Sequence, residues 1–341
     1  MKVRRAIKAV AFASVFAVTA STVVACGGEE TTDGGLTPIT FQTFPGTVQT
    51  IPIKVAQEQG FFKENGLEVS NVDGTNGPAM AAAVAAGQVD VTGLPMFLGM
   101  QSIASGAKLK AVVGLSGGGG SVVFVSDRIP QSDSSYPESA EGLDGKTAAI
   151  AATGGYSERL LRRYVESAGV SLEYVTLPGF SAQVAATKAG EIDVMNFDLV
   201  TAYGLTKKGV GHVLWDFQET GPDEIRGATT TEAWVSDKFL AENPTAAKAF
   251  ARSIVQADAW IEDPANRDAV SGYFSELAGT EVSGKDLDPM VKIMNPVVSA
   301  HDVEIYRGFF DEGTEPPKAD AVLAPIAPQD DAAVAELVEE K

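Results

Sequence analysis

Short apolar runs alternate with longer amphipathic or alanine-rich stretches between residues 37 and 195. Apolar runs bounded by turn residues predict strands, and the longer stretches between them predict helices. We expect strands at 37–41, 67–69, 89–91, 110–115, 122–125, 147–151, 174–175 and 192–195, and helices at 51–59, 78–86, 157–168 and 182–189. This alternation predicts an α/β fold with largely parallel sheets.

Two segments of this pattern are alike in detail. Residues 86–91 read AGQVDV and residues 189–194 read AGEIDV, and each ends a unit of strand, glycine-containing loop, alanine-rich helix and strand. A chance similarity between two βαβ units is the alternative. We interpret the repeat as a sign of two related lobes.

The second half of the chain is expected to become helical. Asn243-Pro244 supplies an N-cap residue and a proline in the first turn, which predicts a helix from there to Trp260. Asp263-Pro264 predicts the start of another helix, and residues 330–341 predict a short acidic helix or a frayed end.

The first 25 residues have the composition of a secretory signal peptide. A basic start precedes an apolar segment, 9–25, that is shorter than the roughly 20 residues of a membrane-spanning helix. The run Val23-Val24-Ala25-Cys26 resembles a bacterial lipobox, which implies lipidation at Cys26 and an anchor on the extracytoplasmic side of the cell membrane. An uncleaved anchor or a chance cysteine is the alternative. Residues 26–36 are then a flexible tether.

Charge and cysteine content exclude several kinds of partner. The formal net charge is −19, and removal of the four basic residues of the signal peptide lowers it to about −23. Such a charge disfavours nucleic acid and anionic lipid. Cys26 is the only cysteine, so no disulfide forms within the chain, and His212 and His301 show no metal-ligand spacing. We therefore expect neither a metal nor a cofactor.

Three segments resemble one family of transport receptors. Residues 55–69, VAQEQGFFKENGLEV, resemble a signature of the nitrate/sulfonate/taurine-type solute-binding proteins, which are the extracytoplasmic receptors of ABC importers. Residues 144–150, DGKTAAI, resemble a strand of that family's second lobe, and Asn243-Pro244 resembles the start of one of its helices. The resemblance covers residues 38–260 and says little about the ligand.

The first of these segments also has a direct physical interpretation. The helix at 51–59 packs an apolar face on a sheet, and Gly60 ends it at a position that needs a positive φ angle. Phe61 and Phe62 follow as aromatic anchors, which we interpret as core residues rather than ligand contacts.

The resemblance implies a periplasmic-binding-protein type II fold, in which two α/β lobes joined by a hinge hold the ligand in a cleft between them. Lobe 1 would comprise residues 37–122 and 230–341, and lobe 2 residues 123–229, with the crossings near 121–126 and 226–234. It also implies a monomeric lipoprotein that captures a small solute by closing its lobes and delivers it to an ABC permease.

The loops at the carboxyl ends of the strands are the candidate ligand site, because ligands of open α/β sheets bind there. The candidate ligand-binding residues are Gln42, Thr43, Phe44, Thr75, Asn76, Leu94, Pro95, Thr153, Gly154, Gly155, Tyr156, Phe180, Asn196, Phe197 and Asp198. Most of these loops enter a helix, whose free N–H groups suit an acceptor-rich ligand, and the glycines of 153–155 allow close approach.

The loops also limit the class of ligand. None contains Arg or Lys, so nitrate fits least, and a sulfonate-like, pyrimidine-like or aromatic solute stays open. Ser157 and Ser181 are interpreted as N-caps. Glu158 and Asp198 are interpreted as exposed carboxylates, with the pairing of a cationic group as the alternative. Asn196 stands where many relatives carry Trp, so the ligand of a relative does not transfer.

Two further functions stay open. The same fold family includes a eukaryotic thiamine-pyrimidine synthase, but that enzyme relies on a cysteine-rich segment and a histidine that have no counterpart in the matching part of this chain. We therefore expect no enzyme activity. A sensor that signals to a membrane kinase is not separable from a transport receptor by sequence.

Overall fold

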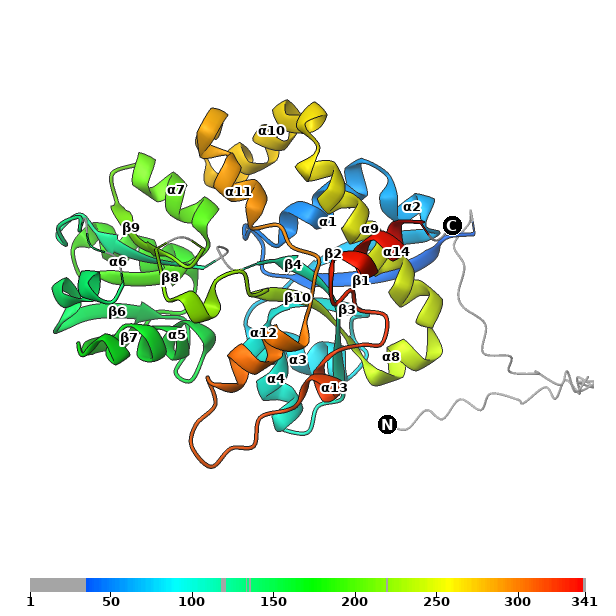
Figure 1. Cartoon of the computed structure of the whole chain (residues 1–341), viewed down its shortest axis with the longest axis horizontal. Coiled ribbons are helices and arrows are strands. Elements are labelled where there is room, and N and C mark those ends of the chain that lie inside the picture. The colour runs from blue at the N-terminus through cyan, green and yellow to red at the C-terminus, as the bar shows by residue number, and fades with distance from the viewer. Residues whose placement is uncertain (1–34, 118–120, 133, 135, 219, 340–341) are drawn as a thin grey trace, which may run out of the picture.

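The structure of the protein is a computed structural model that describes residues 35–117, 121–132, 134, 136–218 and 220–339 (Figure 1). The expected signal peptide, Cys26 and most of the expected tether lie outside the described residues. Among the helices of the described part, none is both long and apolar enough to cross a membrane.

Two five-stranded sheets form the centres of two lobes, which lie side by side in Figure 1. The strand order in lobe 1 is β2 (Leu67–Asp73), β1 (Thr37–Thr43), β3 (Val91–Pro95), β10 (Thr231–Ser236) and β4 (Leu109–Ser116). The strand order in lobe 2 is β7 (Leu172–Thr176), β6 (Lys146–Ile150), β8 (Val194–Phe197), β5 (Val122–Ser126) and β9 (Gly211–Asp216).

Each sheet contains one strand that follows a crossing from the other lobe. The chain leaves lobe 1 after β4 and enters lobe 2 as β5, which runs antiparallel between β8 and β9. It returns after β9 as β10, which runs antiparallel between β3 and β4. The remaining strands of each sheet run in a common direction, as predicted. The sequence pattern predicted neither β9 nor β10, and therefore did not show that the sheets are mixed.

Helices cover both sheets and continue into the C-terminal part of the chain. In lobe 1 they are α1 (Thr50–Glu58), α2 (Phe61–Glu64), α3 (Gly77–Ala85) and α4 (Met96–Ala104), and in lobe 2 α5 (Tyr156–Tyr164), α6 (Phe180–Ala189) and α7 (Leu199–Lys207). The later helices are α8 (Asp237–Glu242), α9 (Pro244–Glu262), α10 (Arg267–Ala278), α11 (Asp288–Lys292), α12 (Ala300–Arg307), α13 (Ala319–Val322) and α14 (Asp331–Glu339). Short 3₁₀ turns lie at Glu138–Leu143, Glu166–Ala168, Asp223–Ile225, Pro264–Asn266 and Gly284–Asp286.

The internal repeat has a structural role that explains its aspartate. β3 and β8 each begin one residue after the Asp of the repeat, later than predicted. Asp90 Oδ2 accepts hydrogen bonds from the N–H and hydroxyl of Thr40, at 2.7 and 2.6 Å. Asp193 Oδ2 accepts one from the N–H of Thr147, at 3.3 Å. In both lobes the aspartate therefore ties the start of one strand to its neighbour.

The signature segment is part of the lobe 1 core, as expected. Gly60 has φ = 87° and separates α1 from α2. Phe62 is buried and packs against Phe250 of α9 with ring centroids 5.3 Å apart, and Phe61 is partly buried against the same core. Both rings therefore belong to the core, and the candidate ligand contacts lie on other elements.

The C-terminal helices contact both lobes. α9 packs on α1 in lobe 1, whereas α10 packs on α7 in lobe 2. Gly204 allows this second contact, because a Cβ atom there would lie 2.0 Å from the carbonyl oxygen of Ala278. Figure 1 shows α10 and α11 above the region between the two lobes. This segment therefore joins the two lobes in addition to the two crossings.

Candidate functional site

Several candidate residues of lobe 2 meet other elements at the junction of the lobes. Asn196, on β8, donates hydrogen bonds from Nδ2 to Ser121 Oγ at 2.8 Å and to the carbonyl of Val122 at 2.9 Å, at the start of the first crossing. Tyr156, at the start of α5, stacks on Phe309 with ring centroids 6.4 Å apart and lies 6.3 Å from Tyr306. Two candidate residues are thus held against the crossing and the C-terminal segment.

A second group of candidate residues forms an aromatic cluster in lobe 2. Phe180 meets the ring of Phe197 edge to face at 5.1 Å, and Phe197 in turn contacts Phe124 of β5 at 5.3 Å. Phe180 is 40% exposed, which is high for a phenylalanine. The cluster therefore offers an apolar, aromatic surface beside the first crossing.

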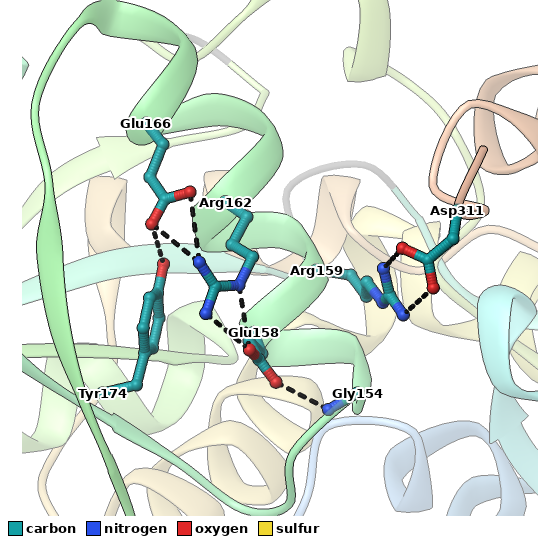
Figure 2. A network of polar contacts seen from close by, with 7 residues as sticks. All are labelled: Gly154, Glu158, Arg159, Arg162, Glu166, Tyr174 and Asp311. Carbon is teal, nitrogen blue, oxygen red and sulfur yellow. Dashed lines mark hydrogen bonds and ion pairs between the residues drawn. The ribbon is translucent and has the colours of Figure 1, made fainter.

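The glycine loop before α5 uses its donors within the chain. Gly154 donates its N–H to Glu158 Oε2 at 2.6 Å (Figure 2). Gly155 donates its N–H to the carbonyl of Ala152 at 3.1 Å. Glu158 accepts from Arg162 as well, at 2.9 Å. A carboxylate of the chain thus occupies the position at the helix N-terminus where an anionic ligand would bind.

Glu158 is buried, and the interpretation of it as an exposed carboxylate is wrong. Burial opposes its ionisation, but the hydrogen bond from Gly154 and the charge of Arg162 together hold the pKa of the Glu158 carboxyl below its usual range. Arg162 also pairs with Glu166 at 3.1 Å and lies 4.3 Å from the centre of the Tyr174 ring (Figure 2). The network therefore links the first turn of α5 to Glu166, just after the helix, and to Tyr174 of β7.

Two candidate side chains act as helix caps. Asn76 Oδ1 accepts the N–H of Ala79 at 2.9 Å, and Asp198 Oδ1 accepts the N–H of Thr201 at 2.8 Å. Burial raises the pKa of Asp198, although its capping hydrogen bonds act in the opposite direction.

The predicted serine caps are wrong. Ser157 lies inside α5, whose N-cap is Gly155, and Ser181 lies inside α6, whose N-cap is Gly179. Both helices begin earlier than the pattern of apolar residues indicated.

The remaining candidates of lobe 1 differ in accessibility. Leu94 is fully buried and its carbonyl accepts the Nε1–H of Trp234 at 3.1 Å. Thr43 Oγ1 accepts Nε2–H of Gln49 at 2.6 Å. Gln42 Oε1 is buried without a hydrogen-bond partner among the described residues. Thr75 is exposed, whereas Phe44 and Pro95 are partly buried.

The sequence pattern did not indicate Glu232, which lies on β10 opposite Leu94 of β3 and Gly114 of β4. It is 0% exposed, and neither carboxylate oxygen has a hydrogen-bond partner among the described residues. Burial, and then the charge of Asp302, raise its pKa well above the usual range, against an opposing interaction with Trp234. A glutamate within the otherwise uncharged segment 228–235 was a usable signal, but the missing prediction of β10 concealed it.

Two tyrosines share this environment. The hydroxyls of Tyr156 and Tyr306 are buried and also have no hydrogen-bond partner of ordinary geometry in the described part of the chain. Burial raises the pKa of Tyr156 to about 12, and the charge of Glu232 adds to the increase. The pKa of Tyr306 is raised by burial and by the charges of its neighbours, Glu232 among them.

Polar contacts also join the lobes at two places away from the crossings. The guanidinium of Arg159 on α5 forms a two-point ion pair with Asp311, with Nη2 and Oδ2 2.6 Å apart (Figure 2). On the other side, the Tyr203 hydroxyl of α7 donates to Asp286 Oδ2 at 2.8 Å. The lobes are therefore held together at the crossings and on both sides of them.

Two surface grooves lie outside the candidate site. One, of about 600 Å³, is lined by residues of α5 and of segment 221–224, and the other, of about 360 Å³, lies between α3 and α4. Neither is lined by a candidate residue. Within the described residues, no group of three or more His, Cys, Asp or Glu side chains is arranged to hold a metal ion.

Comparisons with known proteins agree on one fold. The family model described as NMT1/THI5 like matches residues 47–266. YtlA of Bacillus subtilis (strain 168), named as a candidate binding protein, is 22% identical over 308 residues, which cover 87% of this chain and 88% of YtlA.

Solved structures at lower identity have the same architecture. The alkanesulfonate-binding protein SsuA from Xanthomonas axonopodis pv. citri, bound to MOPS, matches with a TM-score of 0.64 at 17% identity, covering 84% of this chain and 97% of SsuA. The periplasmic nitrate-binding protein NrtA from Synechocystis PCC 6803 matches with a TM-score of 0.63 at 14% identity, covering 82% of this chain and 83% of NrtA. This chain therefore has the two-lobed fold of periplasmic binding proteins.

Proposed function

This chain belongs to the NMT1/THI5-like family, and on that premise we propose that it is the extracytoplasmic solute-binding component of an ABC importer. The observation that carries the proposal is the meeting of candidate residues from lobe 2 with the crossing and the C-terminal segment, seen in the contacts of Asn196 with Ser121 and of Tyr156 with Tyr306. A site built at a junction of lobes can be closed by their relative movement. The solute-binding names of the matching structures support the same role.

In this proposal, residues 37–122 and 230–341 form lobe 1, and residues 123–229 form lobe 2. The sheet order supports this division, because β5 to β9 share one sheet and the other strands share the second. The hinge comprises the two crossings, near 121–126 and 226–234. The ion pair of Arg159 with Asp311 and the hydrogen bond of Tyr203 to Asp286 hold the closed arrangement.

The proposal also places the protein in the envelope. Residues 1–25 are removed as a signal peptide, Cys26 carries the lipid, and residues 26–36 tether a monomeric receptor near its permease. The lipobox-like run before Cys26 supports this placement. Labelling of the expressed full-length chain with a radioactive fatty acid tests it, and Cys26→Ala must abolish the label.

The solute is a small organic molecule, which the protein binds and releases without converting it. The exposed ring of Phe180, with Phe197 behind it, suits an aromatic or apolar part of that solute. Phe180→Ala is therefore expected to weaken solute binding without unfolding the protein. Val175→Ala, on a β7 side chain of similar exposure, is the matched control.

A thermal-shift panel on residues 27–341 tests the function. The panel comprises sulfonates, inorganic anions, pyrimidines, aromatic acids and protonated amines. A solute at about 100 times its dissociation constant adds roughly 2.7 kcal/mol to the free energy of unfolding. In small-angle scattering, the protein is expected to have a smaller radius of gyration with the stabilising solute than without it. A folded protein that none of these classes stabilises contradicts the proposal.

A further inference from the structure

The buried carboxyl groups near the junction of the lobes differ in their hydrogen bonding. Asp302 Oδ1 accepts the N–H of Thr229 at 3.0 Å, and its Oδ2 accepts the N–H and hydroxyl of Ser299 at 2.6 and 2.7 Å. Glu158 is likewise held by Gly154 and Arg162. Glu232 is more deeply buried than either and has no hydrogen-bond partner among the described residues.

An unpartnered buried carboxyl group is costly, and native proteins rarely keep one without a use. No packing reason accounts for this one, because Glu232 lies on a strand whose next residues, Ala233-Trp234-Val235, are apolar and fully buried. An apolar residue at position 232 would continue that core. The carboxyl group therefore has a role outside the fold of the free protein.

Its neighbours indicate what that role is. Glu232 is close enough to Tyr156 and Tyr306 for its charge to act on both hydroxyls, and these buried hydroxyls make no hydrogen bond of ordinary geometry within the described residues. Tyr156 belongs to lobe 2 and Glu232 to lobe 1, so the three groups lie between the lobes. The charged group that acts most on Glu232 is a second carboxyl, that of Asp302.

We infer that Glu232, with the hydroxyls of Tyr156 and Tyr306, binds the protonated nitrogen of a small organic cation. The inference rests on the proposed function and narrows its solute class. A carboxylate accepts N–H donors from two directions, and a tyrosine hydroxyl supplies a further acceptor. The rings of Tyr156 and Tyr306 both pack against Phe309, and aromatic rings also attract a cation.

The inference agrees with the rest of the site. Glu158 already occupies the N-terminus of α5, so this position for an anion is filled from within the chain. With the lobes together, Glu232 is enclosed, and the cation enters when the hinge opens. Binding replaces a protonated, neutral carboxyl group by an ion pair, so the carboxyl proton leaves to solvent and the charge of the solute takes its place.

Calorimetric titration with putrescine, agmatine and benzamidine tests the inference, with isethionate, nitrate and uracil as the anionic and neutral comparison solutes. At least one of the three cations is expected to bind. Titration at pH 7 in buffers of different ionisation enthalpy is then expected to show proton release on binding, because burial raises the pKa of Glu232 in the free protein. Glu232→Gln keeps the shape of the side chain and is expected to weaken that binding at least about 30-fold and to abolish the proton release.

The control is Glu173→Gln, which removes an exposed carboxylate of β7 and is expected to leave binding unchanged. Equal binding of the cation by wild type and Glu232→Gln overturns the inference. Binding of isethionate, nitrate or uracil, with lobe closure but without binding of any cation, also overturns it and leaves the proposed function standing. A folded protein that binds none of the six solutes, and that no class in the wider panel stabilises, contradicts both.

Discussion

Asp258 provides a quantitative test of how burial controls the stability of lobe 1. Its carboxyl group lies on α9 and is 7% exposed. Burial, and then the charge of Glu262 one turn later, raise its pKa from 3.8 to about 8. Between pH 3.8 and about 8, the Asp258 carboxyl group keeps its proton in the folded protein but has released it in the unfolded chain.

The direction of the pH effect follows from that difference. Because the folded state binds the proton more tightly, the contribution of Asp258 to stability is fully present below pH 4 and is lost progressively as the pH rises to about 8. At pH 7 the loss amounts to about 4 kcal/mol, since each unit of pKa difference corresponds to about 1.4 kcal/mol. Asp258→Asn does not ionise and escapes this loss.

We therefore expect Asp258→Asn to gain up to about 4 kcal/mol relative to wild type between pH 4 and pH 7. Urea unfolding followed by tryptophan fluorescence at pH 4, 5.5 and 7 measures the difference. Asp268→Asn, an exposed aspartate of α10, is the control and is expected to show little pH-dependent difference. A stability difference for Asp258→Asn that is the same at all three pH values would refute the reasoning.

Three further predictions concern the contacts between and within the lobes. Gly204→Ala places a methyl group 2.0 Å from the carbonyl oxygen of Ala278, so we expect about 1–3 kcal/mol less stability in urea unfolding. Glu158→Gln removes the buried carboxylate at the start of α5 and is expected to cost about 1–3 kcal/mol at pH 7. Because its pKa is lowered in the fold, that difference is expected to shrink as the pH falls below about 4. Arg159→Ala and Asp311→Ala are each expected to increase the radius of gyration of the free protein in small-angle scattering, and the double variant no further.

Each of these predictions has a matched control. Gly272→Ala on α10 adds its methyl group in open space and is expected to be neutral or slightly stabilising. Glu304→Gln removes an exposed carboxylate of α12, and its effect on stability is expected to be small at every pH. Lys238→Ala breaks an exposed ion pair within α8 and is expected to leave the radius of gyration unchanged. A wild-type radius of gyration in Arg159→Ala would contradict the role of that ion pair in closure.

Local pattern predicted most of the secondary structure of this protein. Some features depend only on residues that are neighbours in sequence. They include the strands rich in β-branched residues, the positive φ at Gly60 and the proline in the first turn of α9. The AG-x-(V/I)-D-V repeat likewise indicated two related units, and its aspartates make equivalent contacts in both lobes. Residue-by-residue preferences are sufficient for features of this kind.

The candidate site was predicted only in part, for a physical reason. Asn196 and Phe197 lie at the end of β8, and Tyr156 and Phe180 begin α5 and α6. Such positions follow from the order of the elements. The occupation of the glycine loop by Glu158 was not predicted, because the burial of that carboxylate depends on how α5 packs.

By itself, the sequence determined the α/β class and the two-lobed family, and it indicated two related units and the strand ends as the place of the candidate residues. Only the tertiary structure decided that β5 and β10 are the antiparallel fourth strands of their five-stranded sheets, and that Glu232 is buried where its charge acts on Tyr156 and Tyr306. These groups are separated by more than 70 residues along the chain. Their meeting depends on two crossings between lobes, and no local preference of the backbone encodes such contacts.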